Sequence, residues 1–146
     1  MSQKQVSKVQ FHYQLKGFNF RERTRLKTFI LKLFKQEGKS LDSITYIFCS
    51  DDYLLSINQQ FLNHDFYTDI ITFNLSESVN LKGEIYISLE RVLDNSLQYN
   101  TSQKEELHRV IFHGALHLCG YNDKSKADKI IMRRKEQAYL NLYWCS

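Results

Sequence analysis

The sequence predicts a small α+β domain in which a mixed β-sheet packs against helices. Segments rich in β-branched and aromatic residues alternate along the chain with segments of helical periodicity. Hydrophobic residues make up 42% and aromatic residues 14% of the 146 residues, enough to bury a core. There is no proline, and no linker or low-complexity tract divides the chain, so residues 1–146 are expected to form one domain.

Four segments carry the composition and alternation of strands. The last two are separated by a polar connection, 76–83, which is expected to close a hairpin. The predicted strands are 6–15, 44–49, 70–75 and 84–89.

Start and stop residues outline the predicted helices. Gly38 follows the last turn of the first helix, where a C-terminal cap is expected. Ser102 and Glu105 form an S-x-x-E capping box at the start of a later helix, which Gly120 ends. Ser125 is expected to cap the last one. The predicted helices are 21–37, 50–61, 89–99, 102–118 and 126–143.

Charge and cysteine content limit the class of protein. The net charge of +4, from 20 basic and 16 acidic residues, is compatible with nucleic acid but common in other proteins. The three cysteines, Cys49, Cys119 and Cys145, form no C-x-x-C pair and are interpreted as reduced thiols. No apolar segment is long enough for a signal peptide or a membrane span, so we expect a cytoplasmic protein without membrane contact.

A metal-binding pattern, H-x3-H-x2-G-x2-D, stands at the end of the fourth predicted helix. His113 and His117 are four residues apart and project from one helix face, as two imidazoles that share a zinc ion must. Gly120 then lets the chain turn back, so that Asp123 can supply a carboxylate to the same ion. We therefore predict one zinc ion per chain, held by His113, His117 and Asp123.

Three protein ligands leave the fourth zinc position for water, which is typical of a catalytic site. Activity is thus expected to depend on these three residues through the bound metal and its water, with the metal also able to polarise a phosphoryl or carbonyl oxygen. The spacing resembles that of metzincin proteases, but Gly114 replaces their general base, a loss of roughly 10²–10⁴-fold for peptide hydrolysis. Two imidazoles and a carboxylate can also hold Fe(II), although no cosubstrate motif supports an oxygenase.

Residues 113–123, H-G-A-L-H-L-C-G-Y-N-D, resemble the H-G-x-L-H-L-x-G-Y-D-H motif of the YbeY family of bacterial endoribonucleases. Residues 58–73 are similar to the family's N-x-x-Y-R-x-x-D-x-P-T-D-V-L-S-F segment, and residues 83–88 to its G-D-I-x-I-S strand. Its M-x3-E-x3-L pattern matches Met132, Glu136 and Leu140. The resemblance covers nearly the whole chain.

This resemblance implies a zincin-like α+β fold with one zinc ion. It also implies a single-strand-specific endoribonuclease that acts in the maturation of ribosomal RNA, above all 16S RNA, and in ribosome quality control. The implied partners are single-stranded or ribosomal RNA and ribosomal small-subunit proteins.

The sequence departs from the family at three positions. Asp123 replaces the third histidine, Leu62 replaces an arginine expected to contact phosphate, and Tyr67 replaces a proline. The loss of the arginine bears on ribonuclease turnover more than on fold or metal binding. His64 stands where many members have lysine and is a candidate for replacing part of that charge.

Other residues are weaker candidates. His64, Asp69 and Tyr121 are the candidate substrate-binding residues, each with an ordinary loop, strand-end or core role as the alternative. His108 and Cys119 are interpreted as packing residues. Basic residues gather on the first and last predicted helices, where a solvated helix face is the alternative to RNA binding. Tyrosines available for stacking on bases are Tyr13, Tyr67 and Tyr121.

Two other functions stay open at this stage. A non-catalytic RNA- or ribosome-associated factor, braced by zinc, is favoured by Leu62 in place of the arginine. A zincin-type peptidase is disfavoured by Gly114.

Overall fold

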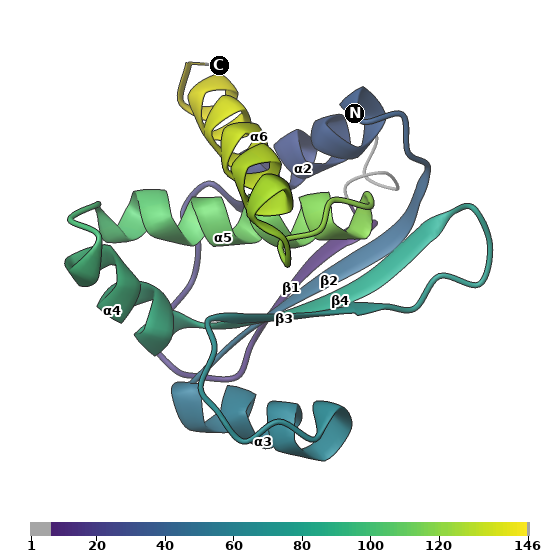
Figure 1. Cartoon of the computed structure of the whole chain (residues 1–146). Coiled ribbons are helices and arrows are strands. Elements are labelled where there is room, and N and C mark those ends of the chain that lie inside the picture. The colour runs from purple at the N-terminus through teal and green to yellow at the C-terminus, as the bar shows by residue number, and fades with distance from the viewer. Residues whose placement is uncertain (1–6, 146) are drawn as a thin grey trace.

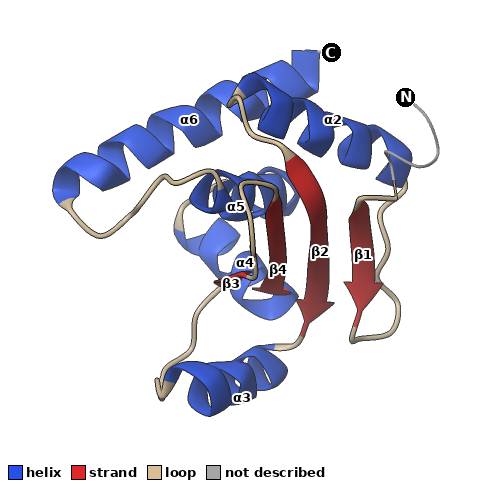
Figure 2. Cartoon of the chain, turned by 90° about the vertical axis from the view of Figure 1, so that its right-hand side faces the viewer, coloured by secondary structure: helices blue, strands red, loops and turns tan. Residues whose placement is uncertain are grey.

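A mixed sheet forms the framework of the molecule. The computed structural model describes residues 7–145, and these contain one four-stranded sheet. The order across the sheet is β1-β2-β4-β3 (Figure 2), with β1, β2 and β4 parallel and β3 antiparallel to β4. The predicted mixed sheet and hairpin are therefore confirmed. The strands are β1 (Val9–Tyr13), β2 (Leu41–Cys49), β3 (Ile70–Asn74) and β4 (Leu81–Ser88).

Helices cover both faces of this sheet. Figure 1 shows α2, α5 and α6 above one face, α3 alone below the other, and α4 leading from the end of β4 into α5. The predicted helices all form, with bounds shifted by one or two residues at most ends. They are α2 (Arg23–Gln36), α3 (Asp51–Leu62), α4 (Leu89–Gln98), α5 (Gln103–Leu118) and α6 (Lys126–Cys145).

Serine side chains cap the starts of four helices, among them α4, where the Ser88 hydroxyl accepts from the Arg91 N–H at 3.1 Å. The hydroxyls of Ser50, Ser102 and Ser125 each accept a hydrogen bond of 3.0–3.1 Å from the main-chain N–H three residues further on. This satisfies one of the N–H groups that the first turn of a helix leaves without a partner. The predicted starts of α3, α5 and α6 are confirmed to within one residue.

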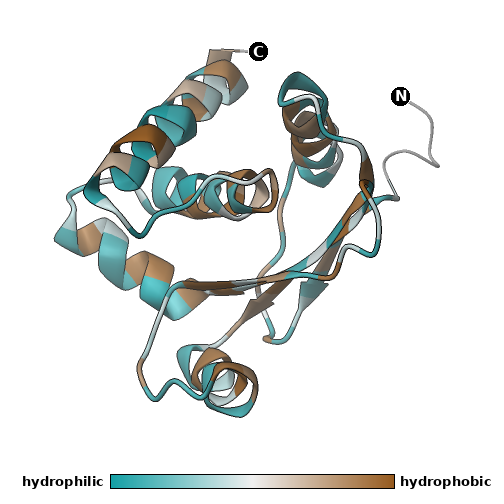
Figure 3. Cartoon of the chain, turned by 45° about the vertical axis from the view of Figure 1, so that its right-hand side comes forward, coloured by the Kyte–Doolittle hydropathy of each residue, from teal (hydrophilic) through white to brown (hydrophobic). Residues whose placement is uncertain are grey.

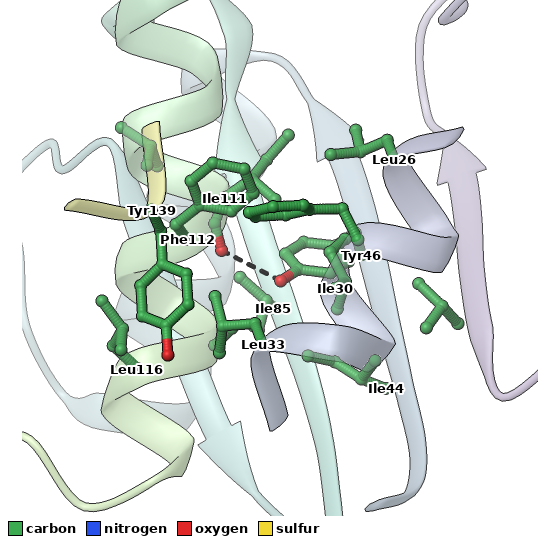
Figure 4. Packing of buried hydrophobic residues seen from close by; sticks show 14 of the residues in the cluster. Leu26, Ile30, Leu33, Ile44, Tyr46, Ile85, Ile111, Phe112, Leu116 and Tyr139 are labelled. Carbon is green, nitrogen blue, oxygen red and sulfur yellow. Dashed lines mark hydrogen bonds between the residues drawn. The ribbon is translucent and has the colours of Figure 1, made fainter. Parts of the chain in front are cut away.

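The main core lies between the sheet and the helices α2, α5 and α6 (Figure 3), where apolar sides of the helices face the strands. Tyr46 of β2 is fully buried there, and its hydroxyl donates a 2.9 Å hydrogen bond to the Ile111 carbonyl of α5 (Figure 4). A smaller cluster around Cys49, Leu54 and Ile71 lies on the α3 side. The core thus anchors α5, the helix that carries both predicted histidine ligands, directly on the sheet.

Two strands begin three residues before their predicted starts. Leu41 of β2 pairs with Leu81 of β4, and an irregularity separates this pair from Ser43, so the ladder extends past the apolar runs. In β1 the described strand is shorter than predicted, and position 6 of the prediction lies outside the described residues.

Within residues 7–145, no helix combines the length and the apolar character needed to cross a membrane.

Candidate metal centre

The two histidines lie side by side on the last two turns of α5. Their ring planes are parallel to within 5°, and the ring centroids are 6.5 Å apart. Gly114 sits between them on the side that faces the sheet. A Cβ atom there would lie 2.8 Å from Ile85 and 3.1 Å from Ile70, so α5 approaches the sheet this closely because residue 114 has no side chain.

The turn after α5 brings the predicted carboxylate back to the first histidine. Gly120 has φ +110°, a conformation that glycine adopts without strain, and its N–H donates to the His117 carbonyl at 3.0 Å. The Tyr121 N–H donates to the Leu116 carbonyl at 3.1 Å. The chain then places Asp123 Oδ2 3.2 Å from His113 Nε2.

Each imidazole is oriented by a hydrogen bond from its Nδ1 atom. His113 donates from Nδ1 to Glu136 Oε2 of α6 at 2.6 Å, and His117 donates from Nδ1 to the Tyr121 carbonyl at 3.0 Å. Histidines that bind metals are commonly held in this way by a carboxylate or a main-chain oxygen, which leaves Nε2 for the ion. The donor set of two such imidazoles and a carboxylate has the chemistry that zinc prefers.

The three predicted ligands are not all in contact with one another. His113 and Asp123 are in contact, while the His117 ring lies one helical turn along α5. In the conformation described for residues 7–145, no group of three or more His, Cys, Asp or Glu side chains is arranged to hold a metal ion. The donor types fit a metal, and the pairwise contacts link His113 to Asp123.

Glu136 joins the site to a buried ion-pair network that the spacing argument did not assign. Only 4% of Glu136 is exposed, and its Oε1 lies 3.6 Å from Arg109 Nη1. Arg109 is itself buried and donates to Gln137 Oε1 at 3.0 Å. Burial acts to lower the pKa of His113, but the hydrogen bond and charge of Glu136 outweigh it, so this pKa is raised. The M-x3-E-x3-L pattern located Glu136 in the sequence without showing its partner.

A cavity of about 750 Å³ opens beside His113 and Asp123, between α4, α5 and α6. Asp69, the residue before β3, lies in its wall, where Asn95 of α4 donates to Asp69 Oδ2 at 3.3 Å. Burial raises the pKa of Asp69 above its ordinary value. Of the three candidate substrate-binding residues, Asp69 is thus the one that the structure places in this cavity.

The other two candidates lie elsewhere. His64 is exposed in the loop after α3, with its ring stacked on Phe66 at a centroid distance of 5.0 Å. The Tyr121 hydroxyl donates to Glu37 Oε1 at 2.7 Å, so this side chain ties the turn to the end of α2. Neither side chain is among those that line the cavity, and Leu62 is not among them either.

His108 and Cys119 are both buried, in agreement with their interpretation as packing residues. The His108 ring stacks on Tyr143 at 5.2 Å, and its Nδ1 donates to the Lys104 carbonyl at 2.7 Å. Burial lowers the pKa of His108 to about 4. Burial also raises the pKa of the Cys119 thiol to about 12.

Comparison with known proteins gives one consistent result. A family model described as Endoribonuclease YbeY matches residues 9–143. A protein of that name from Flavobacterium psychrophilum is 47% identical over 135 residues, which cover 92% of this chain and 96% of the relative. One from Cytophaga hutchinsonii is 48% identical over 126 residues, covering 86% and 88%.

A solved structure supports the same assignment. The solution structure of TM1509 from Thermotoga maritima superposes with a TM-score of 0.68 at 29% sequence identity, and the match covers 93% of this chain and 89% of that one. The fold is therefore shared over nearly the full length of both proteins. Together with the relatives and the match over residues 9–143, this shows that the chain belongs to the Endoribonuclease YbeY family.

Proposed function

We propose that this chain, an endoribonuclease of the YbeY family, hydrolyses single-stranded RNA with one zinc ion held by His113, His117 and Asp123. Its proposed role is the maturation of ribosomal RNA, above all 16S RNA, and ribosome quality control, with ribosomal small-subunit proteins as partners. We place it in the cytoplasm and treat residues 1–146 as a single domain. The relatives' shared name supports the endoribonuclease activity.

The observation that carries the metal assignment is the pair of Nδ1 hydrogen bonds. Glu136 accepts from His113 and the Tyr121 carbonyl accepts from His117, so both rings keep Nε2 for another partner. Asp123 already lies 3.2 Å from one of these nitrogens. When bound, a zinc ion supplies a Lewis acid for a phosphoryl oxygen and lowers the pKa of water to about 7.

The protein's own residues prepare this site for the substrate. The Glu136 carboxylate fixes the ring of His113 and increases its basicity as a ligand. Asp69 and Asn95 form a hydrogen-bonded pair in the wall of the same cavity, where they can orient a ribose or phosphate group. His113 and Asp123 line this cavity, so a phosphodiester bound in it lies beside two of the three proposed ligands.

The packing of α5 argues against the peptidase. A glutamate at position 114 would have to replace Gly114, whose missing Cβ already lies within 3.1 Å of Ile85 and Ile70 atoms. The packing therefore disfavours a general base at the position where metzincin proteases carry it. The non-catalytic factor differs from the proposed enzyme in one measurable respect, which is cleavage of RNA by the zinc-loaded protein.

The test combines metal analysis with cleavage of a labelled single-stranded RNA. Wild type and His12→Ala, a histidine exposed on β1, are expected to retain one zinc per chain and to cleave. His117→Ala is expected to lose both zinc and cleavage. Cleavage that persists in metal-free protein would contradict the proposal. Zinc retained by wild type without cleavage would favour the non-catalytic factor.

A further inference from the structure

We propose that single-stranded RNA enters through the cavity between α4 and α6, with phosphates bound by Lys126, Lys129 and Arg133 and one base stacked on Tyr99. All four residues line the cavity that also contains His113. This inference rests on the proposed function, because it gives the path of the substrate to the proposed metal site.

The three cations form one stripe on α6. Their spacing of three and four residues places them on a single face of the helix, and this face borders the cavity. All three are exposed, and among the described residues no carboxylate lies within 4.0 Å of the ammonium group of Lys126 or Lys129. Arg133 lies 3.7 Å from Glu136 while 60% of its side chain stays exposed. This stripe is available to an incoming anion.

Acidic residues also line the cavity, where Asp123 is 44% exposed beside His113 and two glutamates lie deeper. Glu106 is 5% exposed and Glu136 is 4% exposed, and both lie within 3.8 Å of the buried Arg109 guanidinium. Two nitrogens of Arg109 have no hydrogen-bond partner in the described structure. The buried carboxylates thus surround one buried guanidinium, and the part of the rim that α6 forms is cationic. A phosphodiester backbone is the anion that such a rim suits next to a ribonuclease site.

An exposed aromatic ring faces the cationic stripe across the cavity. Tyr99, just after α4, is 58% exposed, and Ile130, between the α6 cations, is 48% exposed. An exposed ring beside a basic groove is a typical platform for an unpaired base. At about 750 Å³ the cavity has the size of sites that bind ligands as large as a nucleotide.

The tyrosines expected from the sequence to stack on bases are engaged elsewhere. Tyr13 is stacked on Phe48 at 5.7 Å, and the Tyr121 hydroxyl is bonded to Glu37. Tyr67 has the Arg91 guanidinium over its ring at 5.2 Å. None of the three is among the residues that line the cavity.

The basic residues of α2 differ from the α6 stripe. No residue of α2 is among those that line the cavity. Lys27 lies over the Phe11 ring at 5.2 Å, and Arg25 lies over the Tyr143 ring at 4.3 Å, so these two cations contribute to packing. Of the two basic runs in the sequence, the structure thus assigns RNA binding to the one on α6.

The experiment measures the affinity of the full-length protein for a fluorescein-labelled oligouridine by anisotropy at several salt concentrations. A chelator is present to stop metal-dependent cleavage, and circular dichroism checks the fold. Lys126→Ala/Lys129→Ala is expected to weaken binding and to reduce the slope of log K against log salt by about 1.4, or about 0.7 per phosphate contact. The matched control, Lys32→Ala/Lys35→Ala, removes the same charge from exposed positions of α2 and is expected to bind like wild type.

A second pair of variants tests the stacking residue. Tyr99→Ala is expected to weaken binding about 5- to 150-fold, whereas Tyr99→Phe, which keeps the ring, is expected to bind like wild type. Equal affinities of wild type and Lys126→Ala/Lys129→Ala would overturn the inference, as would a loss confined to the α2 control. A wild type that cleaves RNA with zinc in that case would leave the proposed function standing. Conversely, binding through the α6 stripe without zinc-dependent cleavage would support the inference and contradict the proposed function.

Discussion

Helix α5 with its following turn and the segment from the end of α3 to β3 both carry residues that the sequence identified as functional candidates, but their surroundings differ. In the first region, His113 and His117 each donate from Nδ1 to an oxygen fixed by the fold. In the second region, His64 is exposed against Phe66, and 40% of Leu62 is exposed. In the first region, a substitution would leave buried hydrogen-bonding groups without a partner. In the second region, few side chains have such buried partners.

This contrast accounts for two of the three departures from the family pattern, whereas the third, Asp123, lies in the first region beside His113. Leu62 and Tyr67 both lie in the exposed loop region, and neither lines the cavity beside His113. Exchanging an exposed side chain leaves no buried group unpaired, so it costs little stability. In our proposal, the α6 stripe supplies cations for phosphate in place of the one missing at residue 62.

The contrast is tested most severely at Glu136. Glu136→Gln removes the charge that holds His113 and faces Arg109, so zinc affinity is expected to fall about 10- to 100-fold. The free energy of unfolding is expected to fall by about 3–5 kcal/mol, because a buried ion pair loses one partner. Zinc competition with a chelator and urea unfolding measure the two effects.

Glu105→Gln is the matched control for this prediction. It removes the same charge at 3.8 Å from Arg109, but its side chain is 38% exposed and does not touch a histidine. We expect wild-type zinc affinity for this variant. If both variants bind zinc equally well, the buried carboxylate has no special role in orienting His113.

The third histidine of α5, His108, is expected to make the stability of the protein depend on pH. Burial lowers the pKa of His108 to about 4, against an ordinary value of 6.5, while the Lys104 carbonyl acts in the opposite direction. The unfolded chain therefore binds more protons between these values, so stability is full above pH 6.5 and is lost as pH falls toward 4. From pH 7 to pH 5 the loss due to His108 is about 2 kcal/mol. Urea unfolding of wild type and His108→Phe at both pH values measures it, and an equal pH dependence of the two proteins would contradict it.

The sequence predicted those parts of the fold and site that depend on neighbouring residues. Serine caps, the glycine after α5 and helical periodicity all act within one or two turns, and so does the ten-residue return from His113 to Asp123. The hairpin of β3 and β4 was predictable for the same reason, since its two strands are joined by a short polar connection.

The remaining features depend on packing between distant segments. Glu136 reaches His113 across 23 residues, and Tyr121 reaches Glu37 across 84, so no local spacing could show either contact. Tyr99 faces the α6 stripe only because α4 and α6 both pack against α5. The parallel order of β1, β2 and β4 likewise follows from the way the helices pack on the sheet, and their local sequences do not specify it.

The contact between Tyr121 and Glu37 allows a finer test of how the His117 side is held. Tyr121 and Tyr139 both donate their hydroxyls to the Glu37 carboxylate, so replacing either with Phe is expected to cost about 1 kcal/mol of stability. Only Tyr121 also offers its carbonyl to His117. Zinc affinity is therefore expected to fall, by less than about 10-fold, in Tyr121→Phe and to be unchanged in Tyr139→Phe. Equal affinities of the two variants would show that Glu37 does not act on the site through the turn.

The exposed loop should show the smallest effects. His64→Ala is expected to change the free energy of unfolding by no more than about 0.5 kcal/mol and to leave cleavage at the wild-type level. Leu62→Arg restores the cation of the family pattern at an exposed site outside the cavity. It can add at most one phosphate contact, so the salt slope of RNA binding should change by no more than about 0.7, half the effect expected for the two α6 lysines. A rise of more than about 10-fold in cleavage by Leu62→Arg would place this loop in the RNA path, because an arginine outside that path has no reacting phosphate to stabilise.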